Sequence, residues 1–307
     1  MEFQHYSVLL HECIDGLHID PAGTYADGTA GGAGHSREIA KRLTTGKLLA
    51  LDRDPEAVKT AAERLREYSA AEVVQANFSE IASVCRQRKI SGLDGMLMDL
   101  GVSSYQLDNA DRGFSYRYDA PLDMRMSGSG LSAKDIVNQY SLGELDRILR
   151  DYGEEKFSYS IARHIVRARE DKPIETTYEL ADIIKNSMPA AAKREKNPCK
   201  RTFQAIRIAV NDEFGSLREG LDSAFEMLNP GGRLVVITFH SLEDRIVKQA
   251  FGGWCRGCAC PPDFPVCVCG NVPKAKLVNK KPILPSEQEL EENSRSQSAK
   301  LRILEKL

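Results

Sequence analysis

The sequence predicts an α/β protein in which an all-helical domain is inserted into a domain built on a parallel β-sheet. Short apolar runs alternate with helical patterns over the first hundred residues, and only helical periods are visible from residue 141 to about 198. A strongly apolar strand pattern then returns at residues 233–239. Strands that alternate with helices form parallel sheets covered on both faces. We therefore expect sheet-domain segments at residues 1–104 and 203–307, with an inserted loop and helical domain at 105–202.

The first sheet segment shows four short apolar runs and two helical patterns. We expect strands at residues 24–27, 47–52, 72–75 and 95–99. A helix is expected at 36–43, because Ile39, Ala40 and Leu43 recur on one face. Pro55 is expected to open the next helix at its first turn. The buried stripe of that helix is expected at Ala57, Val58, Ala61, Ala62 and Leu65.

The rest of the chain divides into irregular, helical and strand-like stretches. Residues 105–140 are irregular, and three amphipathic stripes follow. These are Leu142, Leu145, Ile148, Leu149 and Tyr152; then Ile161, Ala162, Ile165 and Val166; then Leu180, Ile183 and Ile184. A long amphipathic stretch contains Phe203, Ile206, Val210, Phe214, Leu217, Leu221 and Phe225. A turn is expected at 229–232, a helix at 242–251, and closing strands at 276–278 and 301–304.

Composition narrows the class of protein. The net charge is 42 − 44 = −2, which argues against a general polyanion binder and leaves nucleic-acid contact to local basic patches. No run of 18 apolar residues appears, and Met1–His5 lacks the cationic and apolar regions of a signal peptide. We therefore expect a cytoplasmic protein without a membrane partner.

A glycine-dense loop separates the first strand from the first helix of the sheet. Residues 27–35 read Asp-Gly-Thr-Ala-Gly-Gly-Ala-Gly-His, and glycines let the backbone approach a ligand closely. The spacing is not that of a dinucleotide fingerprint, because the third glycine would fall at Arg37. The loop therefore favours a small nucleoside ligand over a dinucleotide, with an ordinary turn as the alternative.

Three more residues follow the ends of neighbouring strands. Asp52, eighteen residues after Gly34, could accept both ribose hydroxyls of an adenosine, or merely cap the next helix. Phe78 could lie beside the adenine, or pack in the core. Asp99 ends the fourth strand and faces the same crevice. Because ligands bind at the carboxyl edge of such sheets, the joint placement favours a ligand site.

Polar segments elsewhere are weaker signals. The loops at 106–115 and 121–126 are dense in polar groups, which is typical of functional loops or of solvated connectors. The run from Lys193 to Arg201 carries five basic residues against Glu195. It predicts either phosphate contacts or a solvated charged surface.

Five of the eight cysteines lie between Cys255 and Cys269. They read Cys255-x-x-Cys258-x-Cys260, then Cys267-x-Cys269. Four thiolates could close a structural zinc site, but the C-x-C steps are tighter than common zinc frameworks. A zinc site is therefore not favoured over unligated thiols, and no metal ligand is assigned.

Taken together, the motifs resemble the MraW family of bacterial ribosomal small-subunit RNA methyltransferases, also called the methyltransferase H family. The matching stretches run along nearly the whole chain: His5–Leu10, Asp27–Ser36, Asp52–Pro55, Met98–Leu107, Arg112–Ser115, Pro121–Met126, Arg201–Ala205, Phe239–Arg245 and Ser298–Arg302.

The resemblance implies a Rossmann-like methyltransferase sheet that uses S-adenosylmethionine. It implies methylation of the N(4) amine of cytidine 1402 of 16S rRNA, in the decoding region of the small ribosomal subunit. The inserted domain would help to dock this RNA, and neither DNA nor a membrane would be a partner. The implied cofactor-binding residues are Ala33, Gly34, His35, Asp52, Phe78, Asp99 and Gln106.

The implied reaction also suggests catalytic residues. The cytosine amino group shares its lone pair with the ring, so the site must align this nitrogen with the methyl group and accept its proton. Asp99 and the hydroxyls of Ser103 and Ser104 are suitable acceptors. His240 or Phe239 could contact a base that leaves its stack, although a lone histidine is usually structural.

Three alternatives remain at this point. A methyltransferase of a protein or small molecule would leave the inserted domain and the basic run unexplained. A non-catalytic RNA-binding ribosome assembly factor would not need Gly34, Asp52 and Asp99. A nucleotide-dependent oxidoreductase is disfavoured by the glycine spacing.

Overall fold

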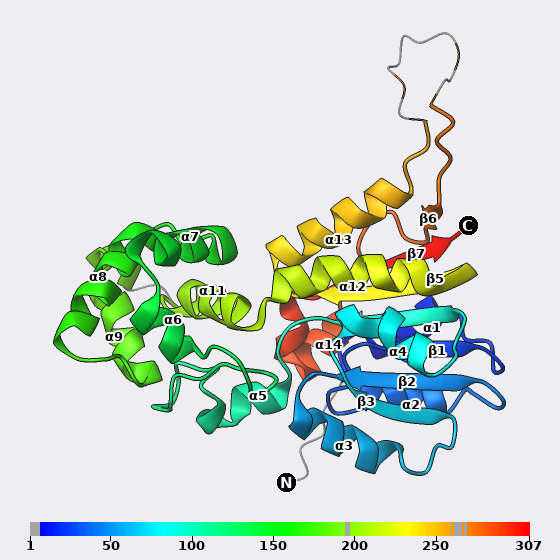
Figure 1. The fold of residues 1–307 in the computed structure, drawn as a ribbon, viewed down its shortest axis with the longest axis horizontal. Coiled ribbons are helices and arrows are strands. Elements are labelled where there is room, and N and C mark those ends of the chain that lie inside the picture. Colours follow the sequence, from blue (N-terminus) through cyan, green and yellow to red (C-terminus); the bar gives the residue numbers. More distant parts are fainter. Residues whose placement is uncertain (1–6, 194–196, 259, 261–265, 267–268) are drawn as a thin grey trace. The chain divides into compact units, whose positions relative to one another are not determined.

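The computed structural model describes residues 7–193, 197–258, 260, 266 and 269–307. It divides into two compact units, coloured along the sequence in Figure 1. Unit 1 extends to Gly101 and resumes at Gly215, and unit 2 comprises Val102–Phe214. The second boundary therefore lies later than the expected position after residue 202. The reason is that Phe203 and Ile206 belong to the hydrophobic core of unit 2.

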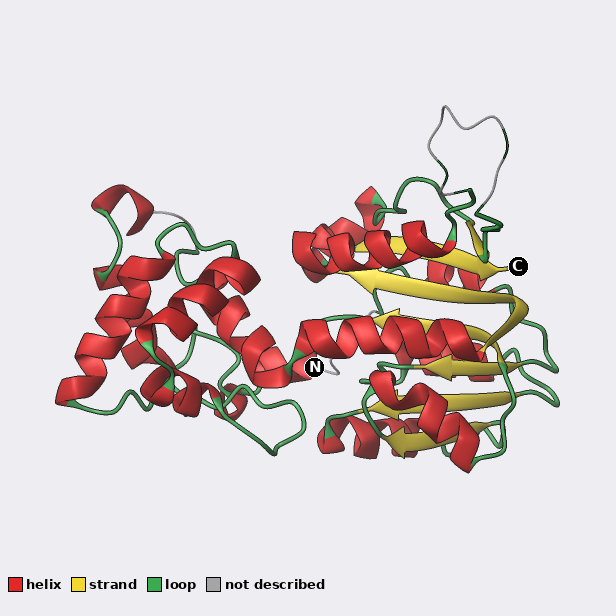
Figure 2. Cartoon of the chain, turned by 45° about the horizontal axis from the view of Figure 1, so that its top comes forward, coloured by secondary structure: helices red, strands yellow, loops and turns green. Residues whose placement is uncertain are grey.

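Unit 1 is built on a seven-stranded sheet with the order β3-β2-β1-β4-β5-β7-β6, shown in yellow in Figure 2. Its strands are β1 (Thr24–Asp27), β2 (Lys47–Asp52), β3 (Ala71–Gln75), β4 (Leu93–Asp99), β5 (Leu228–Thr238), β6 (Ala275–Leu277) and β7 (Lys300–Lys306). The first five strands are parallel, whereas β7 is antiparallel to β5 and to β6. This arrangement confirms the predicted Rossmann-like α/β sheet.

The helices of unit 1 cover both faces of this sheet. They are α1 (Leu10–Leu17), α2 (Gly34–Ala40), α3 (Pro55–Leu65), α4 (Ile81–Gln87), α12 (Glu213–Met227, which begins in unit 2), α13 (Ser241–Trp254) and α14 (Glu287–Glu292). Figure 1 draws α4 and α12 in front of the sheet and α1 and α2 behind it. Leu17 and Ile39 pack with Leu97 and Val235 in one core cluster. None of the described helices is long and apolar enough to cross a membrane.

Most predicted elements of unit 1 are confirmed, and the exceptions have local causes. Pro55 opens α3, and Asp54 is its N-cap, accepting from the Glu56 N–H at 3.0 Å. Ala61 and Leu65 of the predicted α3 stripe are buried, but Ala62 is exposed, so the stripe is wrong there. Residues 229–232 are not a separate turn, because β5 already begins at Leu228 and pairs with β4 through an irregular register.

Unit 2 contains the helices α5 (Ser104–Asp108), α6 (Ala133–Gln139), α7 (Leu142–Gly153), α8 (Ser158–Asp171), α9 (Thr177–Asn186), α10 (Ala190–Lys193) and α11 (Lys200–Asn211). Leu145, Ile161 and Leu180, one from each predicted stripe, are buried in one core. Serine and threonine capping boxes begin α6, α7 and α9. The stretch 203–225, predicted as continuous, breaks at Asp212, whose φ is 44°.

Candidate functional site

The glycine loop after β1 is fastened to the two neighbouring strands. The Gly28 N–H donates to the Leu97 carbonyl at 2.8 Å, and the Ala30 N–H donates to the Leu51 carbonyl at 2.8 Å. A Cβ at position 28 would lie 2.8 Å from Cβ of Phe78, so only glycine fits there. The loop therefore has one defined path between the ends of β2 and β4.

Asp27 is the buried polar centre of this loop. Its Oδ2 accepts from the Ser36 hydroxyl at 2.6 Å, and its Oδ1 accepts from the Thr29 N–H at 3.0 Å. The Thr29 Oγ1 in turn accepts from the Asp99 N–H at 2.7 Å. This network joins the end of β1, the start of α2 and the end of β4. Asp27, Thr29 and Ser36 lie within the glycine-rich motif, but their roles were not predicted from the sequence.

Three predicted cofactor residues begin α2. Ala33 is the N-cap of the helix, with a φ of 60°. Gly34 is the first helical residue, and the Ser7 side chain packs directly against it. His35 is buried, and its Nε2 lies 3.1 Å from the Val8 carbonyl oxygen. An Nε2–H tautomer would donate to that carbonyl.

Asp52 ends β2 and holds the glycine loop. Its Oδ2 accepts from the Gly31 N–H at 2.8 Å, and its Oδ1 accepts from the Asp54 N–H at 2.9 Å. The alternative that Asp52 caps α3 is wrong, because Asp54 is the N-cap. Burial raises the pKa of the Asp52 carboxyl to about 6, although both N–H groups oppose the shift. Each carboxylate oxygen keeps a second lone pair, so further donors such as ligand hydroxyls can be accepted.

Asp99 ends β4 in a different state. Its Oδ1 is buried and has no hydrogen-bond partner among the described residues. Its Oδ2 lies 3.9 Å from Nδ1 of His35. The side chain is nevertheless 24% exposed, so a ligand can reach it. Burial and the nearby acids Asp27, Glu243 and Glu289 raise the pKa of the Asp99 carboxyl to about 8.

Two of these acids come from distant parts of the sequence and were not predicted. Glu289 of α14 accepts from the Leu9 N–H at 2.9 Å, and burial raises its pKa. Glu243 of α13 accepts from the Phe239 N–H at 2.9 Å. These carboxyls surround Asp99, whose Oδ1 has no partner among the described residues. Such a group favours a cationic ligand, because a nearby cation stabilises the ionised acids.

His240 is the N-cap of α13. Its Nδ1 accepts from the Glu243 N–H at 3.4 Å, and its Nε2 lies 3.0 Å from Oε1 of Glu243. Both ring nitrogens therefore face Glu243. This arrangement gives His240 a structural contact in the helix start, and its proposed contact with a target base stays a prediction.

Phe78 lies directly after the N-cap Asn77 of a short 3₁₀ helix, η1 (Phe78–Glu80). Its ring packs against Gly220 of α12, where a Cβ would collide with it. The Asn77 side chain donates to the Ser216 hydroxyl at 2.9 Å. Core packing thus accounts for one side of the ring, and its contact with an adenine stays a prediction.

Ser103, Ser104 and Gln106 lie in unit 2, where they begin α5. The Gln106 N–H donates to the Ser103 hydroxyl at 3.2 Å, and the Ser103 N–H donates to Oε1 of Gln106 at 3.0 Å. These two contacts form a capping box. The side chain of Gln106 is buried in this unit. Their predicted roles toward cofactor and substrate are not tested by these contacts.

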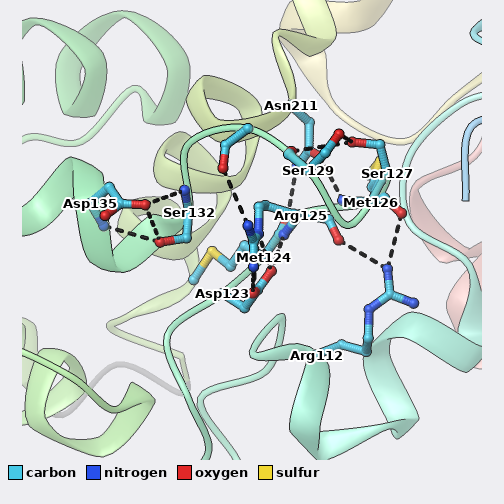
Figure 3. A network of polar contacts seen from close by, with 11 residues as sticks. Arg112, Asp123, Met124, Arg125, Met126, Ser127, Ser129, Ser132, Asp135 and Asn211 are labelled. Atoms are coloured by element: carbon cyan, nitrogen blue, oxygen red, sulfur yellow. Dashed lines mark hydrogen bonds and ion pairs between the residues drawn. The ribbon is translucent and has the colours of Figure 1, made fainter.

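The polar segment 121–126 is a folded part of unit 2 and not a solvated connector. Leu122, Met124 and Met126 are buried in its core. Figure 3 shows how this segment is held: Arg112 donates to the carbonyls of Arg125 (2.9 Å) and Met126 (3.1 Å). Asn211 donates to the Met124 carbonyl and accepts from the Met126 N–H. The alternation of apolar and polar residues in this segment therefore has a structural cause.

The predicted basic run is only partly described. Arg194, Glu195 and Lys196 lie outside the described residues. Lys193 ends α10, and Lys200 and Arg201 begin α11 with exposed side chains. Their contact with phosphate stays a prediction.

Comparison with known proteins gives one family over almost the whole chain. The model of the "MraW methylase family" matches residues 2–307. A protein of Agathobacter rectalis named ribosomal RNA small subunit methyltransferase H 2 is 56% identical over 311 residues, covering 100% of this chain and 99% of the relative. Proteins named ribosomal RNA small subunit methyltransferase H from Ruminiclostridium cellulolyticum and Clostridium botulinum strain Kyoto are each 55% identical, with 100% of both chains covered.

Proposed function

The chain belongs to the MraW methylase family, and from this membership we propose that it methylates the N(4) amine of cytidine 1402 of 16S rRNA. The methyl donor would be S-adenosylmethionine. The names of its relatives support small-subunit rRNA as the substrate. The nucleotide and the atom rest on the motifs that resemble the family. We also propose that the protein acts on the small ribosomal subunit in the cytoplasm.

The observation that carries the choice of cofactor is the contrast between Asp52 and Asp99 at one edge of the sheet. Asp52 is pinned by the Gly31 and Asp54 N–H groups, which suits an acceptor for two ribose hydroxyls. Asp99 has a buried oxygen without a partner among the described residues, which suits a positively charged group. S-adenosylmethionine contains an adenosine ribose and cationic groups, and it supplies an electrophilic methyl group when bound.

The loop residues complete this proposed cofactor site. Ala33 and Gly34 would contact the cofactor through the backbone at the start of α2. His35 is held by the Val8 carbonyl and presents its other nitrogen toward Asp99 at 3.9 Å. Phe78, in the 3₁₀ helix η1 that follows β3, would provide an apolar edge for the adenine.

The chemical contribution of the protein would be alignment and proton acceptance. An ionised Asp99 can accept a hydrogen bond from the reacting amine or a proton as the new bond forms. The carboxyl ionises readily only with a cation nearby, because its pKa is about 8 without one. The roles of Ser103, Ser104 and Gln106 rest on the sequence, and His240 would act as part of the wall around the base.

The test is methyl transfer to defined substrates. Small subunits from a strain that lacks this modification are incubated with methyl-labelled S-adenosylmethionine, and the RNA is digested to nucleosides. We expect N(4)-methylcytidine, mapped by mass spectrometry to position 1402. Subunits with uridine at that position should take up no label.

Each alternative predicts a different outcome of the same experiment. Label in ribosomal protein would support a protein methyltransferase. Retained binding to the subunit without any label would support a non-catalytic assembly factor. Label in RNA at another position would contradict the proposed target nucleotide. It would still support RNA methylation as the reaction.

A further inference from the structure

A long connection between α13 and β6 carries the clustered cysteines, and we call residues 255–274 the cysteine loop. Its base is closed where the Lys274 N–H donates to the Trp254 carbonyl at 2.8 Å. The described residues of the loop form no helix or strand. These described residues are therefore not ordered by helical or strand pairing.

Three sulfur atoms converge within this loop. The Sγ atoms of Cys258, Cys260 and Cys269 all lie within 4.8 Å of one another. The Sγ atoms of Cys258 and Cys269 are 3.7 Å apart. A tetrahedral zinc ion with Zn–S bonds of about 2.3 Å requires neighbouring sulfurs to be about 3.8 Å apart. We propose that Cys258, Cys260 and Cys269 are ligands of a structural zinc ion.

Contacts around the cysteines match this role. The Cys260 N–H points at the Cys258 sulfur at 3.4 Å, and such a donor stabilises a thiolate. The Asn271 side chain donates to the carbonyls of Arg256 at 3.2 Å and Gly257 at 2.7 Å. It thereby holds the two residues that precede Cys258. Partners of this kind orient metal ligands in known sites.

The described valines of the loop form no apolar core that could replace a metal. Val266 and Val272 are each 69% exposed, so their burial contributes little to ordering the loop. Ordering the backbone costs about 1–2 kcal/mol per residue, and metal binding is a known source of that free energy in small loops. The thiols would lose their protons to the solvent on binding zinc.

This proposal reverses the sequence interpretation, and the reason is geometric. In the sequence, both C-x-C steps are tighter than in common zinc frameworks, so zinc was possible but not favoured. The sulfur of Cys269 lies 3.7 Å from that of Cys258, so cysteines that are distant in the sequence belong to one ligand set. Cys267 lies outside the described residues. Cys255 is not part of the converging group, and three thiolates leave the fourth position of the ion to another ligand.

Metal analysis of the full-length protein tests the site directly. The protein is purified under reducing conditions from zinc-supplemented cells, and its metal content is measured by mass spectrometry. We expect about one zinc per chain, falling to below about 0.1 in the variant C258S/C260S/C269S. The matched control Cys85→Ser, on α4, should keep the wild-type zinc content.

Cobalt substitution identifies the ligands. Cobalt(II) in the wild-type protein should give the absorption bands of tetrahedral thiolate coordination, and the triple variant should lack them. Folded wild-type protein without zinc, or a triple variant with the full zinc content, would overturn the proposal. Intact-mass analysis showing a disulfide between Cys258 and Cys269 in the reduced preparation would also overturn it. None of these readouts depends on methyl transfer, so they separate this site from the proposed function.

Discussion

The ends of β2 and β4 each carry one aspartate, and the protein holds the two carboxyls in opposite ways. Both oxygens of Asp52 accept backbone N–H groups, whereas Oδ1 of Asp99 has no partner within the described chain. The pKa is about 6 for Asp52 and about 8 for Asp99. Asp52 is therefore held in place as a hydrogen-bond acceptor before a ligand binds. The charge of Asp99 depends on which ligand binds beside it.

The largest expected effect is on the rate of methyl transfer when Asp99 is replaced. Asp99→Asn keeps the shape and removes the ability to ionise, so methyl transfer should fall by about 100-fold or more. Single-turnover transfer to small subunits at saturating cofactor measures this rate. Glu63→Gln, at an exposed carboxyl of α3, is the matched control and should keep the wild-type rate. A loss of less than about threefold in Asp99→Asn would contradict the role of the acid.

The second effect concerns stability and pH without ligand. The folded pKa of Asp99 is about 8, against a model value of 3.8, so ionisation disfavours the folded state. The contribution of this group to stability is full below about pH 4 and is lost as the pH rises toward 8. Raising the pH from 5 to 8 should therefore destabilise the wild type, relative to Asp99→Asn, by about 2–4 kcal/mol.

Urea unfolding of both proteins at the two pH values measures this difference. The comparison between the proteins cancels the titration of groups that do not interact with Asp99. Parallel changes in their free energies of unfolding would mean that Asp99 is already ionised in the folded protein.

The third effect is on cofactor affinity when Asp52 is replaced. Asp52→Ala removes the acceptor for the Gly31 N–H and for the proposed ribose hydroxyls, so cofactor affinity should fall by about 1–3 kcal/mol. This corresponds to about 5- to 150-fold in Kd. Calorimetric titration measures it. Turnover at saturating cofactor should change much less than in Asp99→Asn, and an unchanged Kd would remove Asp52 from the ligand site.

The smallest effect is on stability, when the hydrogen bond between Thr29 in the glycine loop and Asp99 at the end of β4 is removed. Thr29→Val removes the oxygen that accepts the Asp99 N–H at 2.7 Å and leaves that donor without its partner. The free energy of unfolding should fall by about 1 kcal/mol. Thr60→Val on α3, whose hydroxyl donates to the Glu56 carbonyl within the same helix, is the control and should change stability less. Equal losses would show that the link carries no special weight.

The sequence predicted the positions of Asp52 and Asp99 because strand periodicity alone assigns residues to strand ends. It could not predict which groups surround them. Glu289 reaches this region from a position 280 residues away from its partner Leu9, and no local pattern encodes such a contact. The roles of Thr29 and Ser36 depend on a loop path that only the packed sheet defines. The continuation of unit 2 to Phe214 also depends on packing, because Phe203 and Ile206 have the same periodicity as the residues of α12.

The number of protons released during cofactor binding shows whether the bound cofactor ionises Asp99. Calorimetric titration of S-adenosylmethionine at pH 7, in two buffers with different ionisation enthalpies, gives the number of protons released. If binding places a cation beside Asp99 and lowers its pKa from about 8, close to one more proton should leave the wild type than leaves Asp99→Asn. Equal proton counts for the two proteins would contradict the account.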